Sequence, residues 1–196
     1  VKTIASLIVK NLNQSKLLDA VLLASDLSKA DLSTNMVGQF PELQGIMGRY
    51  YALNEKISEE VAFAIEDHYK PRFSGDTLPR NPIGDIVAIA DKIETLIGLF
   101  SIGEKPTGDK DPFALRRQVI GIIRILTEKN IGLNLNTIIS DAIKATKLTE
   151  SKDLHSFIFD RISNFFKVKY FYWNQQDHTY LLIHFFFRYI KYNSMN

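Results

Sequence analysis

Apolar residues recur every three or four positions along most of this chain, which is the spacing of one buried face of an α-helix. The clearest case follows Asn81 and Pro82, which suit the cap and the first position of a helix. One stripe then continues through Ile83, Ile86, Val87, Ala90, Ile93 and Ile97. The same spacing predicts helices over 16–27, 58–70, 136–147 and 152–166. Because no convincing strand-like alternation occurs before residue 167, the sequence predicts an all-α fold.

Local signals set the expected ends of two of these helices. Asn13 or Ser15 is placed to cap the first helix, and the Ser58 hydroxyl is placed to cap the second. The second helix should end one or two residues before Pro71, because a proline disfavours the α conformation in its predecessor. Residues 31–48 contain three glycines and a proline, and should form an ordered connection rather than one continuous helix.

Composition excludes several classes of protein and site. The 196 residues include no cysteine, so there is no disulfide framework and no thiolate zinc site, which fits a cytoplasmic protein. The net charge is only +2, so any basic surface must be local. The longest apolar run, 181–190, is too short to span a bilayer, and no membrane contact is expected. The chain begins with valine, and we expect it to be part of a longer protein.

The segment DPFALRRQ, residues 111–118, predicts the start of a further helix. Asp111 can cap this helix, and Pro112 fits its first position. On a helical wheel one stripe holds Leu115, Val119, Ile122 and Leu126, and the opposite side holds Arg117, Gly121 and Arg124. The two arginines would then flank a notch that has no side chain.

Arginine suits RNA, because its planar guanidinium binds phosphate through two hydrogen bonds and stacks on exposed bases. The predicted notch would let an RNA backbone approach closely, and two lysines in the preceding loop add positive charge. The candidate RNA-binding residues are Arg116, Arg117, Arg124, Lys105 and Lys110. The alternative is that the arginines form ion pairs with residues such as Glu104 and Asp109, or cover the edge of the core with their stems.

Four blocks of the sequence resemble the β subunit of the bacterial, two-subunit glycyl-tRNA synthetase. They include ADLSTNMVGQFPELQGIMGRYYA, DHYKPRFSGDTLP, VAIADKIETLIGLFSIG and DPFALRR, and the resemblance runs from about residue 17 to about 166. It implies a degenerate HD-like helical domain over 1–104. A partial anticodon-binding bundle of the DALR type would follow over 105–166, with Asp111, Ala114, Leu115 and Arg116 at the four named positions.

The final segment, residues 167–196, departs from the family and from both periodicities. It holds 10 of the 22 aromatic residues, and we assign it no structure. Such a tail is a possible platform for stacking bases, but its divergence favours a frameshifted or truncated end. A nonfunctional remnant of a truncated β subunit is therefore one alternative function.

The resemblance implies a role in joining glycine to tRNA(Gly). The chain would help to recognise the tRNA in a complex with the α subunit, which carries the catalytic core. ATP, Mg and glycine would bind to that α subunit, so we expect no cofactor and no catalytic centre in this chain.

The resemblance also places Asp31, His68 and Asp91 at metal-ligand positions of active HD phosphohydrolases. Those enzymes use a larger set of His and Asp ligands to hold ions that activate water. Here Ala30 precedes Asp31 where a histidine would stand, and His68 is the only histidine before residue 155. We expect no metal, and we expect the three residues to act as caps, ion-pair partners or hydrogen-bonded core residues. A metal-dependent HD-type phosphohydrolase is the alternative from the enzyme class.

Overall fold

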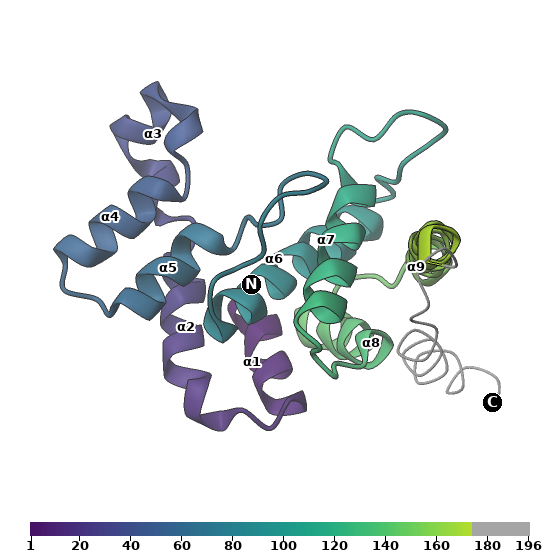
Figure 1. The fold of residues 1–196 in the computed structure, drawn as a ribbon, viewed down its shortest axis with the longest axis horizontal. Coiled ribbons are helices and arrows are strands. Elements are labelled where there is room, and N and C mark those ends of the chain that lie inside the picture. The colour runs from purple at the N-terminus through teal and green to yellow at the C-terminus, as the bar shows by residue number, and fades with distance from the viewer. Residues whose placement is uncertain (174–196) are drawn as a thin grey trace.

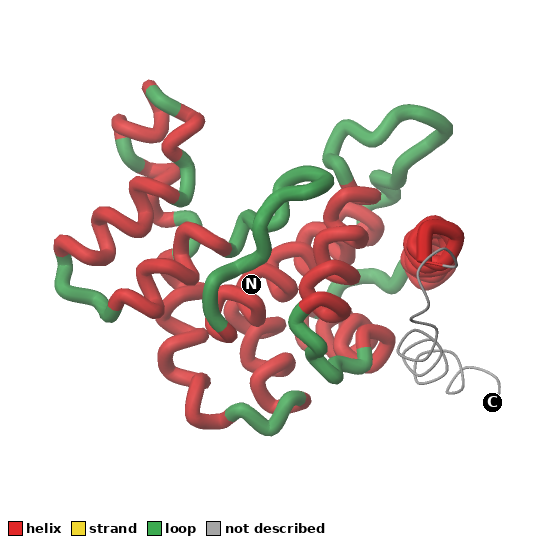
Figure 2. Tube along the Cα trace, viewed as in Figure 1, coloured by secondary structure: helices red, strands yellow, loops and turns green. Residues whose placement is uncertain are grey.

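The computed structural model describes residues 1–173, and the side chains of residues 1–167. Within this range the chain consists of α-helices and short 3₁₀ turns without a strand, which confirms the all-α prediction (Figures 1 and 2). The α-helices are α1 (Lys2–Asn11), α2 (Leu18–Leu27), α3 (Asn35–Gln39), α4 (Ile46–Asn54), α5 (Glu59–Asp67), α6 (Pro82–Ser101), α7 (Leu115–Glu128), α8 (Leu135–Thr146) and α9 (Lys152–Trp173). None of the described helices is long and apolar enough to cross a membrane.

Helix α6 lies at the centre of the molecule (Figure 1). It contacts α1, α2 and α5 as well as α7, α8 and α9. Every residue from Ile83 to Ile93 is buried, as expected for a helix that is covered on all sides. The start of α6 agrees with the prediction, because the Asn81 side chain accepts a hydrogen bond from the Gly84 amide at 2.8 Å and Pro82 is the first helical residue.

One hydrophobic core connects the two predicted halves of the chain. Buried residues before residue 104, such as Ile8 and Ile97, belong to the same cluster as Val119, Ile139 and Ile158. Helix α1 packs against α8, although they are far apart in the sequence. The division at residues 104 and 105 stays a prediction, but the core does not stop there.

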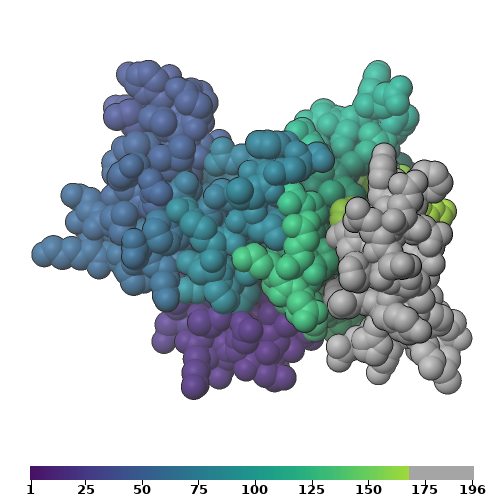
Figure 3. Space-filling model, in the orientation of Figure 1, coloured from purple at the N-terminus to yellow at the C-terminus, as the bar shows by residue number. Residues whose placement is uncertain are grey.

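Two segments project from the same edge of the molecule. One contains α3 and α4, and the other is the connection between α6 and α7 (Figure 1). The space-filling view shows the edge hollowed between them (Figure 3). Residues 31–48 form the first projection as two 3₁₀ turns, the short α3 and the start of α4, so the prediction of an ordered, interrupted connection is confirmed.

Several predicted helix ends were wrong. Helix α5 begins after Ser58, but the Ser58 hydroxyl makes no capping bond, and the helix ends at Asp67. Helix α2 begins only at Leu18, because a 3₁₀ turn runs directly into it, and neither Asn13 nor Ser15 caps it. The Leu18 amide donates to the Ser15 carbonyl within that turn, so this amide needs no side-chain cap.

Two elements were missed or cut short by the sequence analysis. Helix α1 was not predicted, although Ile4 and Ile8 are spaced as one buried face. Helix α9 continues beyond the predicted end at residue 166 as far as Trp173, so the start of the aromatic tail is helical. The rest of that tail, 174–196, lies outside the described residues.

Candidate nucleic-acid interface

Asp31, the first of the three positions that the resemblance assigned to metal ligands, binds backbone amides. Its side chain is buried, and its Oδ2 accepts hydrogen bonds from the amides of Gly45 at 2.6 Å and Gly48 at 3.2 Å. These are the cap and first-turn amides of α4, which have no partner inside the helix. Asp31 therefore caps α4 from a distance in sequence, and it ties the projecting segment together.

His68, the second position, is a buried neutral ring at the end of α5. Its Nδ1 lies 2.6 Å from the carbonyl oxygen of Ile65, and its ring contacts the ring of Tyr69. Burial, with smaller contributions from the charges of Lys29 and Lys92, lowers the pKa of His68 to about 4, although Asp91 acts in the opposite direction. At neutral pH the ring contributes no charge to this region.

The third position, Asp91, already has a cation. The Lys29 ammonium lies 2.5 Å from its Oδ1. Burial alone would lower the pKa of Lys29, but the hydrogen bond and negative charge of Asp91 outweigh it and raise that pKa. Within the described residues no three His, Cys, Asp or Glu side chains are grouped to hold a metal ion. Asp91 thus forms an ion pair with a partly exposed lysine, and the absence of a metal stays a prediction.

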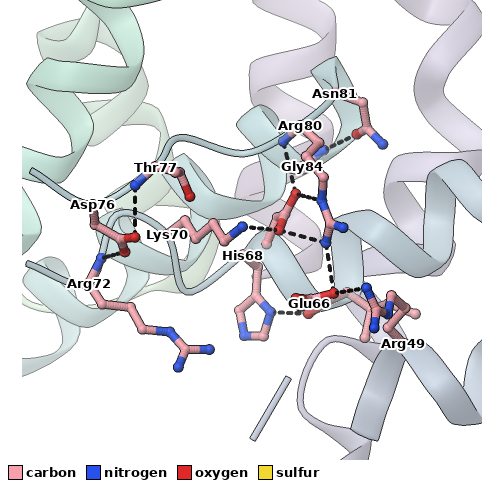
Figure 4. A network of polar contacts seen from close by, with 12 residues as sticks. Arg49, Glu66, His68, Lys70, Arg72, Asp76, Thr77, Arg80, Asn81 and Gly84 are labelled. Atoms are coloured by element: carbon pink, nitrogen blue, oxygen red, sulfur yellow. Dashed lines mark hydrogen bonds and ion pairs between the residues drawn. The ribbon is translucent and has the colours of Figure 1, made fainter. Parts of the chain in front are cut away.

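A network of charged side chains holds the loop between α5 and α6 against the protein (Figure 4). Asp67 is fully buried, and it accepts hydrogen bonds from the Arg80 side chain at 2.7 and 2.9 Å and from the Arg80 amide at 2.8 Å. Lys70 pairs with Asp67, and Glu66 joins Arg80 to Arg49. Burial would raise the pKa of Asp67, but these partners outweigh it and lower that pKa.

This network was not predicted from the sequence. The available signal was the pair of adjacent carboxylates that ends α5, followed by a loop that contains two arginines. That pattern indicates a local ion pair without saying which arginine closes it. The structure selects Arg80, while the Arg72 side chain points away from the network (Figure 4).

Lys92 joins α5, α6 and α7. Its side chain is buried, and its ammonium donates to the carbonyl oxygens of His68, Tyr69 and Lys70 at 3.3, 3.4 and 2.9 Å. These carbonyls follow the last turn of α5, where oxygen atoms lack helical partners. Burial lowers the pKa of Lys92 to about 8. Its stem passes Gly121, so the predicted notch in α7 is filled by lysine and is closed to an RNA backbone.

Replacing Gly121 by alanine is expected to destabilise the fold by about 1–2 kcal/mol. The new Cβ would lie 2.8 Å from the Lys92 Cε, and three hydrogen bonds prevent that side chain from moving aside. Gly98→Ala in α6 is the matched control, because nothing lies within 4 Å of its Cβ position. Alanine favours a helix over glycine, so the control should gain up to about 1 kcal/mol in urea unfolding. A gain in both variants would contradict the close packing.

The start of α7 differs from the prediction in position but not in its cap. Asp111 accepts hydrogen bonds from the amides of Leu115 at 2.8 Å and Arg116 at 3.0 Å. The helix nevertheless begins at Leu115, and Pro112 lies before it. Ala114 has a left-handed backbone with φ 54, which turns the chain into the helix and displaces the first turn from Pro112.

The five candidate cations do not form one cluster. The Arg116 side chain donates to the Gly108 carbonyl at 2.5 Å, Arg124 pairs with Glu128, and Lys105 pairs with Asp153. Lys110 lies on the projecting loop, where its backbone pairs with that of Thr107. Arg117 is exposed, and no described residue pairs with it. Their role in binding RNA stays a prediction, for which Arg117 is the best placed of the five.

Arg117 lines a cavity of about 250 Å³ at the seam between the two predicted domains. The other lining residues are Gln44, Tyr69, Pro71, Arg72, Ala114 and Gln118. The structure thus brings Arg72, which the sequence analysis did not select, to the same cavity as Arg117. The Arg72 guanidinium lies 5.4 Å from the centre of the Tyr69 ring and donates to the Gln44 carbonyl at 3.2 Å.

Comparisons with known proteins agree on one family. A sequence model described as the glycyl-tRNA synthetase beta subunit matches residues 1–176. The chain is 57% identical over 168 residues to the glycine–tRNA ligase beta subunit of Methylobacillus flagellatus, a match that covers 83% of this chain and 24% of that protein. It is 61% identical over 142 residues to that of Nitrosomonas europaea, covering 72% and 20%. The chain spans about a quarter of the length of the curated relatives it matches.

Proposed function

The chain belongs to the glycyl-tRNA synthetase β-subunit family, and from this premise we propose that it binds tRNA(Gly) as part of a complex with an α subunit. The observation that carries the proposal is the pair of exposed arginines, Arg72 and Arg117, at one cavity that no carboxylate of the described residues lines. Guanidinium groups bind phosphate in a bidentate manner and retain their charge at every physiological pH. A chain with a net charge of +2 needs such a local site to hold a polyanion.

The proposed contribution to glycylation is recognition rather than chemistry. The three former metal positions hold backbone amides, a buried carbonyl contact and a lysine, which leaves them engaged in the fold. ATP, Mg and glycine would act on the α subunit, in the cytoplasm where tRNA is charged. Co-purification with an α subunit and a glycine-charging assay of the complex test this part of the proposal.

Arg117→Glu is expected to weaken tRNA(Gly) binding at least about 10-fold and to reduce its dependence on salt, because a phosphate contact is replaced by repulsion. Filter binding at several salt concentrations measures both effects. Arg124→Glu should act mainly on stability, since this arginine is already paired with Glu128. Lys16→Glu is the charge-matched control, as Lys16 is exposed in the turn between α1 and α2, at the opposite edge (Figure 1).

Equal losses of tRNA affinity for Arg117→Glu and Lys16→Glu would show that only the net charge of the chain matters, and would remove the support for a specific site at the cavity. Absence of tRNA(Gly) binding by the complex with the α subunit at low salt would contradict the proposed function itself.

A further inference from the structure

We propose that the cavity at the seam holds one backbone phosphate of an unpaired RNA segment, gripped from two sides by Arg72 and Arg117. The neighbouring bases stack on Phe73 and Phe113. This inference rests on the proposed function and names the form of RNA that the site takes. It adds Arg72, Phe73 and Phe113 to the interface, none of which was a candidate from the sequence.

The charges around the cavity favour an anion. Two arginines line it from different segments, Arg72 from the loop before α6 and Arg117 from the first turn of α7. The nearest carboxylate in the loop, Asp76, is occupied by the amides of Arg72 at 2.6 Å and Thr77 at 2.7 Å. Arg72 donates one of its five side-chain N–H groups to the Gln44 carbonyl, which fixes the side chain and leaves the other N–H groups available.

The size of the cavity favours part of a polymer over a whole small molecule. Its volume of about 250 Å³ is below the range of about 300–1,000 Å³ typical of small-molecule sites. It also lies between the two projecting segments, since Gln44 belongs to the first and Ala114 to the second. A phosphate within a strand meets both conditions.

Two exposed aromatic rings favour an unpaired strand. Phe73 is 60% exposed and follows Arg72 directly, and Phe113 is 45% exposed and precedes Ala114, another lining residue. Exposed phenylalanines beside a cationic groove are the usual means of binding single strands, because a base stacks on each ring. Bases in a duplex are already stacked on each other, and cannot use these rings.

The first experiment measures binding of a fluorescent six-nucleotide unstructured RNA to the full 196-residue chain by anisotropy. Arg72→Gln and Arg117→Gln should each weaken binding about 10-fold, and Lys16→Gln should leave it unchanged. Because both arginines hold the same phosphate, the double variant should lose clearly less than the product of the two single losses. The slope of log affinity against log salt should fall by about 0.7, the value for one phosphate on a single strand.

The second experiment separates stacking from charge. Phe73→Leu and Phe113→Leu should each weaken single-strand binding about 5- to 10-fold and leave binding of a duplex of the same length unchanged. Phe159→Leu is the matched control, because Phe159 is 48% exposed on α9 and distant in sequence from the cavity. Thermal unfolding of each variant checks that it is folded.

Three results would overturn the inference. The first is that the single and double arginine variants bind the RNA as tightly as the unaltered chain. The second is that the loss of affinity in the double variant equals the product of the two single losses, which would mean that the arginines bind two independent phosphates. Displacement of the RNA by millimolar inorganic phosphate would assign the cavity to a free anion instead. If tRNA(Gly) binding still depends on Arg117 in these cases, the proposed function stands while the unpaired-strand site fails.

Discussion

Replacing Asp67 by alanine is expected to lower the free energy of unfolding by about 2–3 kcal/mol, because its buried carboxylate accepts charged hydrogen bonds while the Arg80 side chain left behind is partly exposed and can be hydrated. The Asp67 carboxylate is fully buried and accepts three hydrogen bonds from Arg80 in addition to its pair with Lys70. Without it the Arg80 amide loses its partner, and the loop that leads into α6 is no longer fixed. Urea unfolding followed by circular dichroism measures the change.

Asp153→Ala is the control for this prediction. Asp153 also pairs with a basic side chain, Lys105, but both are about half exposed. Exposed pairs contribute at most about 1 kcal/mol, so the control should stay close to the unaltered chain. Similar losses in both variants would show that burial does not determine the strength of the Asp67 contacts. Asp67→Ala should also weaken RNA binding at the seam, because Arg72 lies on the loop that Asp67 anchors.

Acid should destabilise the chain through His68. In the folded state burial lowers the pKa of His68 from its ordinary value near 6.5 to about 4. Between these pH values the unfolded chain binds a proton at His68 that the folded chain does not bind, so the contribution of His68 to stability falls as the pH decreases through this window. Burial raises the pKa of Asp85 to about 6, so protonation of that carboxyl changes stability in the opposite direction over part of the same range. The full effect of His68 is about 3 kcal/mol, reached near pH 4. Asp67 has a lowered pKa, so its own contribution is lost at more acidic pH.

The difference between the unaltered chain and His68→Gln isolates this effect. Glutamine does not titrate, so the variant should lose less stability than the unaltered chain between pH 6.5 and pH 4. His155→Gln is the control, because His155 lies partly exposed beside Glu150 and its replacement should leave the pH dependence of the unaltered chain in place. Parallel stability profiles for all three proteins would contradict a buried, neutral His68.

Local sequence patterns predicted those features that depend only on neighbouring residues. Asn81 and Pro82 start α6 as expected, since capping and a fixed φ angle act within one turn. Asp111 caps the start of α7 for the same reason, although the left-handed Ala114 delays the helix. Four sequence blocks were also sufficient to indicate the family that the comparisons show.

The sequence by itself therefore determined the helical fold and the family, because periodicity and capping are properties of short segments. Only the tertiary structure decided which charges are available. It filled the notch at Gly121 with the stem of Lys92, paired Lys29 with Asp91, and placed Arg72 and Arg117 at one cavity. These contacts join segments far apart in the chain, and the burial and charge of a distant partner leave no mark on the local pattern.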